Sequence, residues 1–174
     1  EAGRDARLGR ISHYCASLEI RGCGEKLLAG AYDAALLRDP ADLYELTPEA
    51  LWPLERMGQT LAQKLVAAVQ ARRQPDLATF LQSLGIDELG PAAAKLLQQH
   101  YGTLARVRAA TVEELTAIHG IGPEIAASVV SGLVRRAPLI ERLLRYVTPR
   151  ETATSPATGP LAFPAGGSPR DPGV

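Results

Sequence analysis

Residues 117–130 read Ala-Ile-His-Gly-Ile-Gly-Pro-Glu-Ile-Ala-Ala-Ser-Val-Val, and this stretch decides the fold. Gly120 and Gly122 flank one apolar residue, Ile121, and glycine permits the positive φ of a tight turn. Pro123 suits the first position of a helix, where a missing N–H costs nothing. The apolar residues that follow recur at helical spacing. The stretch therefore predicts a helix, a tight glycine turn and a second helix.

The same pattern occurs three more times upstream, with the turn glycines 34, 32 and 32 residues apart. These glycines are Gly24, Gly58, Gly90 and Gly122. Apolar residues recur four positions before each glycine, and again three, four and seven positions after it. A fixed period of this size indicates repeated supersecondary units that bury their apolar faces on one another.

A second, longer period groups these units in pairs. Thr47 and Thr111 each lie eleven residues before a turn glycine and are predicted helix N-caps. Thr111 and Glu114 also have the spacing of a capping box. We therefore predict two copies of a paired helix–hairpin–helix module. The predicted divisions are a polar N-terminal segment at 1–10, modules at 11–75 and 76–147, and a tail at 148–174.

Local signals predict the remaining helix ends. Asp39, Asp76 and Thr103 are predicted N-caps, Gly102 is a predicted C-terminal cap, and residues 10–17 are predicted to start the first helix. No strand pattern occurs in the sequence. The predicted fold class is therefore all-α, with tandem helix–hairpin–helix repeats that place four hairpins in two paired modules. Six of the 13 prolines lie after residue 147, which predicts a disordered C-terminal tail.

Charge and composition restrict the possible functions. The formal net charge is +0, which argues against holding nucleic acid by bulk charge. Paired arginines near predicted helix ends are interpreted as solvated helix faces. They are Arg72 and Arg73, Arg106 and Arg108, Arg135 and Arg136, and Arg142 and Arg145.

Targeting and cysteine signals are weak. No apolar run approaches the roughly 18 residues of a membrane span, and the charged N-terminus lacks an apolar signal core. Cys15 and Cys23 form neither a disulfide framework nor a zinc knuckle. We therefore expect a reduced, cytoplasmic, monomeric chain that holds no metal or cofactor.

The hairpins suggest a chemistry for phosphate. A glycine turn followed by a helix directs unpaired backbone N–H groups outward, with the positive end of the helix dipole behind them. Phosphate fits such a site, and because no base edge is read, binding should be independent of sequence. The predicted DNA-binding residues are Gly22, Cys23, Gly24, Glu25 and Lys26; Arg56, Met57, Gly58 and Gln59; Gly85, Leu89 and Gly90; and Gly120, Ile121 and Gly122. Lys26, Arg56, Lys64 and Lys95 could add side-chain contacts.

Another interpretation is that the glycines only make tight turns between packed helices. Four turns in register favour phosphate binding over that interpretation. The second unit carries Arg56 where the others have a small residue or an altered loop, so its turn is expected to differ.

Several of these segments together resemble one family. Residues 18–27 read Leu-Glu-Ile-Arg-Gly-Cys-Gly-Glu-Lys-Leu, and residues 54–58 read Leu-Glu-Arg-Met-Gly. With the segments at 39–47, 84–90 and 120–123, they resemble, in order and spacing, the helix–hairpin–helix region of bacterial NAD-dependent DNA ligases. The resemblance covers roughly residues 10–147.

That family seals nicks in duplex DNA during replication and repair, using NAD as adenylate donor. The resemblance implies that this chain clamps duplex DNA, nicked DNA in particular, mostly through minor-groove phosphates, next to catalytic ligase domains. NAD and magnesium would belong to those domains.

The chain also departs from the family. It has no Lys-x-Asp-Gly adenylation motif, and residues 1–9 contain no cysteine where the family's zinc module should end. Residues 159–162 resemble the approach to the family's BRCT domain, but the pattern is lost from Phe163. We therefore expect that the chain does not catalyse ligation on its own.

Two other functions remain open. A helical protein-interaction module would show a large exposed apolar patch. A base-excision glycosylase would need a catalytic acid after the fourth hairpin, at a site whose burial tunes the carboxylate. The acids available there are Glu141, Glu151 and Asp171.

Overall fold

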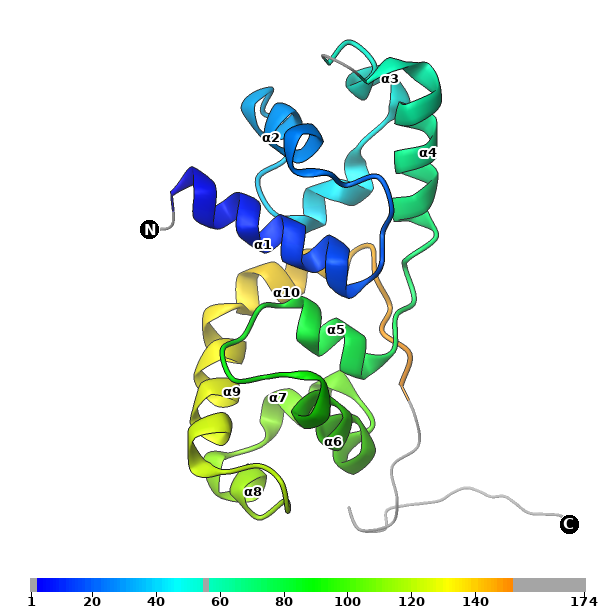
Figure 1. Ribbon diagram of the computed structural model, residues 1–174. Helices are drawn as coiled ribbons and strands as arrows, with labels where there is room; N and C mark the ends of the chain where they lie inside the picture. Colours follow the sequence, from blue (N-terminus) through cyan, green and yellow to red (C-terminus); the bar gives the residue numbers. More distant parts are fainter. Residues whose placement is uncertain (1–2, 55–56, 152–174) are drawn as a thin grey trace, which may run out of the picture.

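The computed structural model describes residues 3–54 and 57–151, and within them the chain is helical, without a strand. Figure 1 shows these elements. In chain order they are α1 (Arg4–Ser17), α2 (Glu25–Asp33), the 3-10 helix η1 (Pro40–Glu45), α3 (Pro48–Leu51), α4 (Gly58–Gln70), α5 (Leu77–Ser83), α6 (Pro91–Tyr101), α7 (Leu104–Ala109), α8 (Val112–Thr116), α9 (Pro123–Arg135) and α10 (Ala137–Leu143).

The predicted duplication is confirmed. Helices α2, η1, α3 and α4 begin 64 to 66 residues before α6, α7, α8 and α9, which take the same places in the second module. The first half of the chain lies above the second in Figure 1, and the halves meet where α1 packs against α5 and α10 packs against η1. One continuous apolar core, with Tyr14 and Phe80 as its largest fully buried side chains, spans both halves.

Most predicted caps are present. The side chains of Asp39, Thr47, Thr103 and Thr111 each accept a hydrogen bond from a first-turn amide, and Thr111 completes its capping box. Asp76 differs. It holds the N-cap position of α5, but its carboxylate accepts hydrogen bonds from the Arg150 guanidinium at 2.6 and 3.1 Å instead of capping the helix.

Both ends of the ordered chain extend beyond the predicted boundaries. Helix α1 begins at Arg4, not near residue 10, because its C-terminal half buries Ile11 and Tyr14 while Arg4 is paired with Asp33 at its other end. After α10, the amide of Thr148 donates to the carbonyl of Arg73 at 2.7 Å, so the first residues of the predicted tail pair with the segment after α4. The rest of that tail, 152–174, lies outside the described residues.

Two of the paired arginines bind backbone carbonyls, which the sequence did not predict; Arg72 is nevertheless exposed, and Arg136 is half-buried. Arg72 Nε donates to the carbonyl of Leu18 at 2.9 Å, and Arg136 Nε donates to the carbonyl of Leu84 at 2.9 Å. The two bonds are equivalent. In each module an arginine directly after the helix that follows the second hairpin (α4 or α9) satisfies a carbonyl at the end of the first helix (α1 or α5), a group that has no intrahelical donor.

Replacing Arg136 with methionine is expected to lower the free energy of unfolding by about 1–2 kcal/mol, because it leaves the carbonyls of Leu84 and Gly85 without their charged donor. Methionine keeps most of the apolar stem, so lost packing contributes little. Chemical denaturation of the variant beside Arg145→Met, at an exposed arginine, measures the difference. Equal stabilities of the two variants would contradict a structural role for the bond.

Candidate nucleic-acid interface

The helices of the chain begin in two different ways. Helices η1, α3, α7 and α8, which connect the hairpins, are capped by their own side chains. Helices α2, α4, α6 and α9, which follow the hairpins, have no side-chain cap. Their first-turn amides lack an intrahelical acceptor and lie at the positive end of the helix dipole. The four hairpins therefore present the backbone groups that bind anions.

Glycine occupies the N-cap of three of these helices although the fold does not require it there. Gly24, Gly90 and Gly122 have φ of −70°, −88° and −82°, which any residue can adopt. A Cβ on any of them would meet no atom within 4 Å. Neither backbone strain nor packing accounts for these glycines. What they do is leave the helix amides open to approach.

The positive φ of the turn falls on a different residue, two positions earlier. In the first and fourth hairpins it is glycine, with φ of +93° at Gly22 and +103° at Gly120. In the third hairpin Glu88 takes this position with φ of +69°. The sequence predicted tight-turn geometry for the repeating glycines as a group, whereas in the structure one residue makes the turn and another leaves the helix amides exposed.

The second hairpin is different, as the sequence predicted. Gly58 itself has φ of +66°, and Met57, in the N-cap position of α4, is in the right-handed helical region. Gly58 is therefore a glycine that the backbone requires, unlike Gly24, Gly90 and Gly122. Arg56 lies outside the described residues.

Several predicted contacts cannot donate to a ligand through their own amides. The amides of Met57, Leu89 and Ile121 already donate to Leu54, Ile86 and Ile118 within their turns, and the three side chains are buried. Gly85 lies at the end of α5, where its amide donates to Gln82 and its carbonyl accepts a hydrogen bond from Arg136. These residues give the hairpins their shape. The candidate donors that remain are the N-cap glycines and the residues that follow them.

The structure adds two candidate donors that were not predicted from the sequence, the amides of Ala92 and Glu124. Pro91 and Pro123 have no N–H and occupy the first position of α6 and α9, so the next amide along the helix becomes the donor. The Gly-Pro pair at each site was the signal that could have identified them. In α2, which lacks this proline, Glu25 and Lys26 remain the predicted donors.

Charged side chains around the hairpins are few. Lys26, Lys64 and Lys95 are exposed on α2, α4 and α6. Cys23, in the first hairpin, is half-buried, and a hydrogen bond from the Cys15 thiol lowers its pKa against the opposing effect of burial. The site depends mainly on backbone dipoles.

This geometry defines a helix-hairpin-helix protein. Residues 79–134 match the family described as helix-hairpin-helix motif, a segment that contains the third and fourth hairpins.

The chain is also similar to a segment of DNA ligases. It is 42% identical to the DNA ligase of Anoxybacillus flavithermus over 132 residues, which are 75% of this chain and 20% of that protein. It is 41% identical to that of Haloarcula marismortui over 149 residues, 80% of this chain and 21% of that protein. It is 38% identical to the DNA ligase of Symbiobacterium thermophilum over 162 residues, which are 87% of this chain and 24% of that protein. The chain is thus a homologue of the helix-hairpin-helix region of a DNA ligase, as the resemblance predicted, and spans a fifth to a quarter of these relatives.

Two kinds of feature are absent from the described residues. No helix among them is long and apolar enough to cross a membrane. Nor do residues 3–54 and 57–151 bring three histidine, cysteine or acidic side chains together in a way that could hold a metal ion.

Proposed function

We propose that the chain binds duplex DNA without sequence preference, as the DNA-clamping part of a DNA ligase. The observation that carries this proposal is the trio Gly24, Gly90 and Gly122. Each is an N-cap glycine that neither φ nor packing requires, on a helix with no side-chain cap. Turn formation alone does not account for them, whereas the close approach of a phosphate oxygen to helix amides does.

The proposed donors fit a chain whose formal net charge is +0. Main-chain amides bind phosphate through fixed dipoles, so the chain needs no large basic surface. Phosphate contacts position a protein on a duplex and carry no sequence information. The clamp would therefore hold any duplex at any position.

The finer parts of the proposal come from the resemblance and the relatives' names. The whole protein would seal nicks in DNA replication and repair, with NAD as adenylate donor. NAD and magnesium would act in the catalytic domains, which would be the partners of this region in the cytoplasm. Nicked duplex would be the preferred ligand.

The alternatives have less support. The exposed large apolar side chains of the described residues are Leu61, Val134 and Leu144, and single exposed apolar side chains are ordinary on a protein surface. Among the acids available to a glycosylase, Glu141 is paired with Arg108 at 2.9 Å, and Glu151 accepts a hydrogen bond from the amide of Leu104. Asp171 lies outside the described residues.

A binding titration tests the proposal. Labelled nicked duplex, intact duplex and single strand, each in two unrelated sequences, are titrated with the chain at several salt concentrations. We expect duplex binding that is equal for both sequences. If three lysines each neutralise one phosphate, the slope of log K against log salt is about −2.7. Failure to bind any duplex at low salt would refute the proposal for this chain, and a preference for single strands would refute the clamp.

A further inference from the structure

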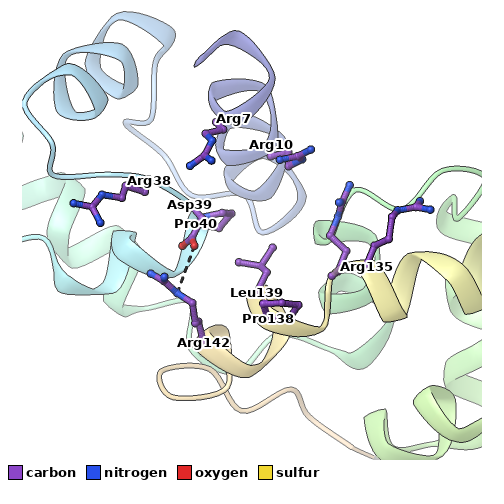
Figure 2. Close-up of a pocket in the computed structure, with 10 residues that line it drawn as sticks. Arg7, Arg10, Arg38, Asp39, Pro40, Arg135, Pro138, Leu139 and Arg142 are labelled. Carbon is purple, nitrogen blue, oxygen red and sulfur yellow. Dashed lines mark ion pairs between the residues drawn. The ribbon is translucent and has the colours of Figure 1, made fainter. Parts of the chain in front are cut away.

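A pocket between the two modules collects arginines from distant parts of the sequence. It has a volume of about 270 Å³. Arg7 and Arg10 come from α1, and Arg38 comes from the segment before η1. Figure 2 shows them around the pocket together with Arg135 and Arg142, which come from α9 and α10. Arg136 completes the lining, whose one carboxylate is Asp39. We call this cavity the junction pocket.

The side chains that line the junction pocket carry more positive than negative charge. Arg142 pairs with Asp39 at 3.4 Å and with Asp42 at 3.0 Å. Arg136 donates to backbone carbonyls, which neutralise nothing. Apart from Arg7, the lining has five arginines near three carboxylates, those of Asp39, Asp42 and Asp87, so positive charge exceeds negative charge there although the net charge of the chain is +0.

The guanidinium groups are close enough to affect one another. Burial lowers the pKa of Arg136 most, and the neighbouring charges of Arg10 and Arg135 lower it further. Arginine nevertheless stays charged at neutral pH, so the fold holds like charges together across the module junction. An anion bound between them would reduce their mutual repulsion.

The junction pocket is separate from the hairpins. No N-cap glycine or first-turn residue of α2, α4, α6 or α9 lines it. Arg135 is the last residue of α9, so it lies about 20 Å along the helix from the amides of the fourth hairpin.

We propose that the junction pocket is a second anion site, which binds a ligand bearing one or two phosphoryl groups and ties the two modules together. Guanidinium groups bind phosphate through paired N–H donors and keep their charge when partly buried. The volume is below that of pockets for drug-sized ligands, so the ligand is small or is one end of a larger one. A free pyrophosphate-like anion and a backbone phosphate of nucleic acid share this chemistry.

The test uses the full chain and inorganic pyrophosphate, at an ionic strength held constant with sodium chloride. We expect saturable binding by calorimetry. With pyrophosphate at about 100 times its Kd, the Tm should rise by about 5–10 °C, since a ligand that binds only the folded state stabilises it. Arg10→Gln and Arg135→Gln are each expected to weaken pyrophosphate binding at least tenfold. Arg145→Gln, which removes one exposed charge outside the pocket, is the matched control and should bind like the parent.

Competition with duplex DNA identifies the source of the phosphate. If duplex displaces pyrophosphate and Arg135→Gln also weakens duplex binding, the pocket takes a phosphate of the DNA backbone. If duplex and pyrophosphate bind together without competing, the pocket takes a free anion. The proposal is overturned if pyrophosphate raises the Tm no more than chloride does, or if Arg10→Gln and Arg145→Gln bind pyrophosphate equally. Duplex binding by the hairpins is measured separately, so either proposal can fail alone.

Discussion

Replacing Gly90 and Gly122 together with aspartate is expected to lower duplex affinity at least 100-fold while the chain stays folded. Both positions have a φ that any residue can adopt and open space where the new side chain begins. Aspartate is also a preferred N-cap residue, so its carboxylate accepts hydrogen bonds from the same amides that would bind phosphate. The aspartate carboxylate therefore occupies the amides to which the phosphate would bind.

The size of the effect follows from the bonds lost. A hydrogen bond to a charged group contributes about 1.5–3 kcal/mol, and each aspartate also places a negative charge beside the phosphate. The loss of one such bond at each of two hairpins lowers the affinity for duplex at least about tenfold per hairpin. The same change gains a few tenths of a kcal/mol in helix stability, because a capping side chain replaces glycine. Binding and stability should therefore change in opposite directions.

The measurement pairs a duplex titration with a thermal melt. Gly3→Asp is the positional control, because Gly3 is also an uncapped N-cap glycine with open space, but it precedes α1 and follows no hairpin. It should leave duplex affinity unchanged. The double alanine variant, which cannot cap, should lose much less affinity than the double aspartate variant. If the aspartates leave affinity at the parent value in a folded chain, the hairpin amides do not bind the DNA.

Replacing Gly132 with valine is expected to destabilise the chain by about 2–3 kcal/mol, which corresponds to a Tm lower by about 4–12 °C. A Cβ at this position in α9 would lie 2.6 Å from Cγ2 and 3.0 Å from Cγ1 of Ile86. Ile86 is buried in the third hairpin and branches at Cβ, so its side chain cannot move aside. The strain exceeds what α9 gains when glycine is replaced in a helix interior.

A double-mutant cycle with Ile86→Ala isolates this contact. Alanine at residue 86 removes Cγ2 and Cγ1, the two atoms nearest the new Cβ, and keeps only the Cβ at 3.3 Å. The double variant should therefore be more stable than the sum of the two single changes predicts, by about 1 kcal/mol or more. Additive effects would mean that the close approach of α9 to the third hairpin does not limit the fold.

The repeating features of this protein could be predicted from its sequence because they depend on neighbours a few residues apart. Apolar spacing predicted the helices, and Thr47 and Thr111 cap as their spacing indicated. The phosphate chemistry of the hairpins rests on the same kind of local pattern and stays a prediction; the structure shows that the helices after the hairpins have no side-chain cap. Asp76 was misjudged because its actual partner, Arg150, is 74 residues away.

The sequence by itself determined an all-α chain of four hairpins in two paired modules, since a period of about 32 residues repeats one locally encoded unit. Only the tertiary structure decided which backbone groups are used. It showed that the amides of Met57, Leu89 and Ile121 already donate hydrogen bonds within their own turns. The tertiary structure also brought together the side chains that line the junction pocket, which come from positions as far apart as Arg7 and Arg142. No local pattern encodes this grouping, because the packing of α10 against η1 decides which side chains meet.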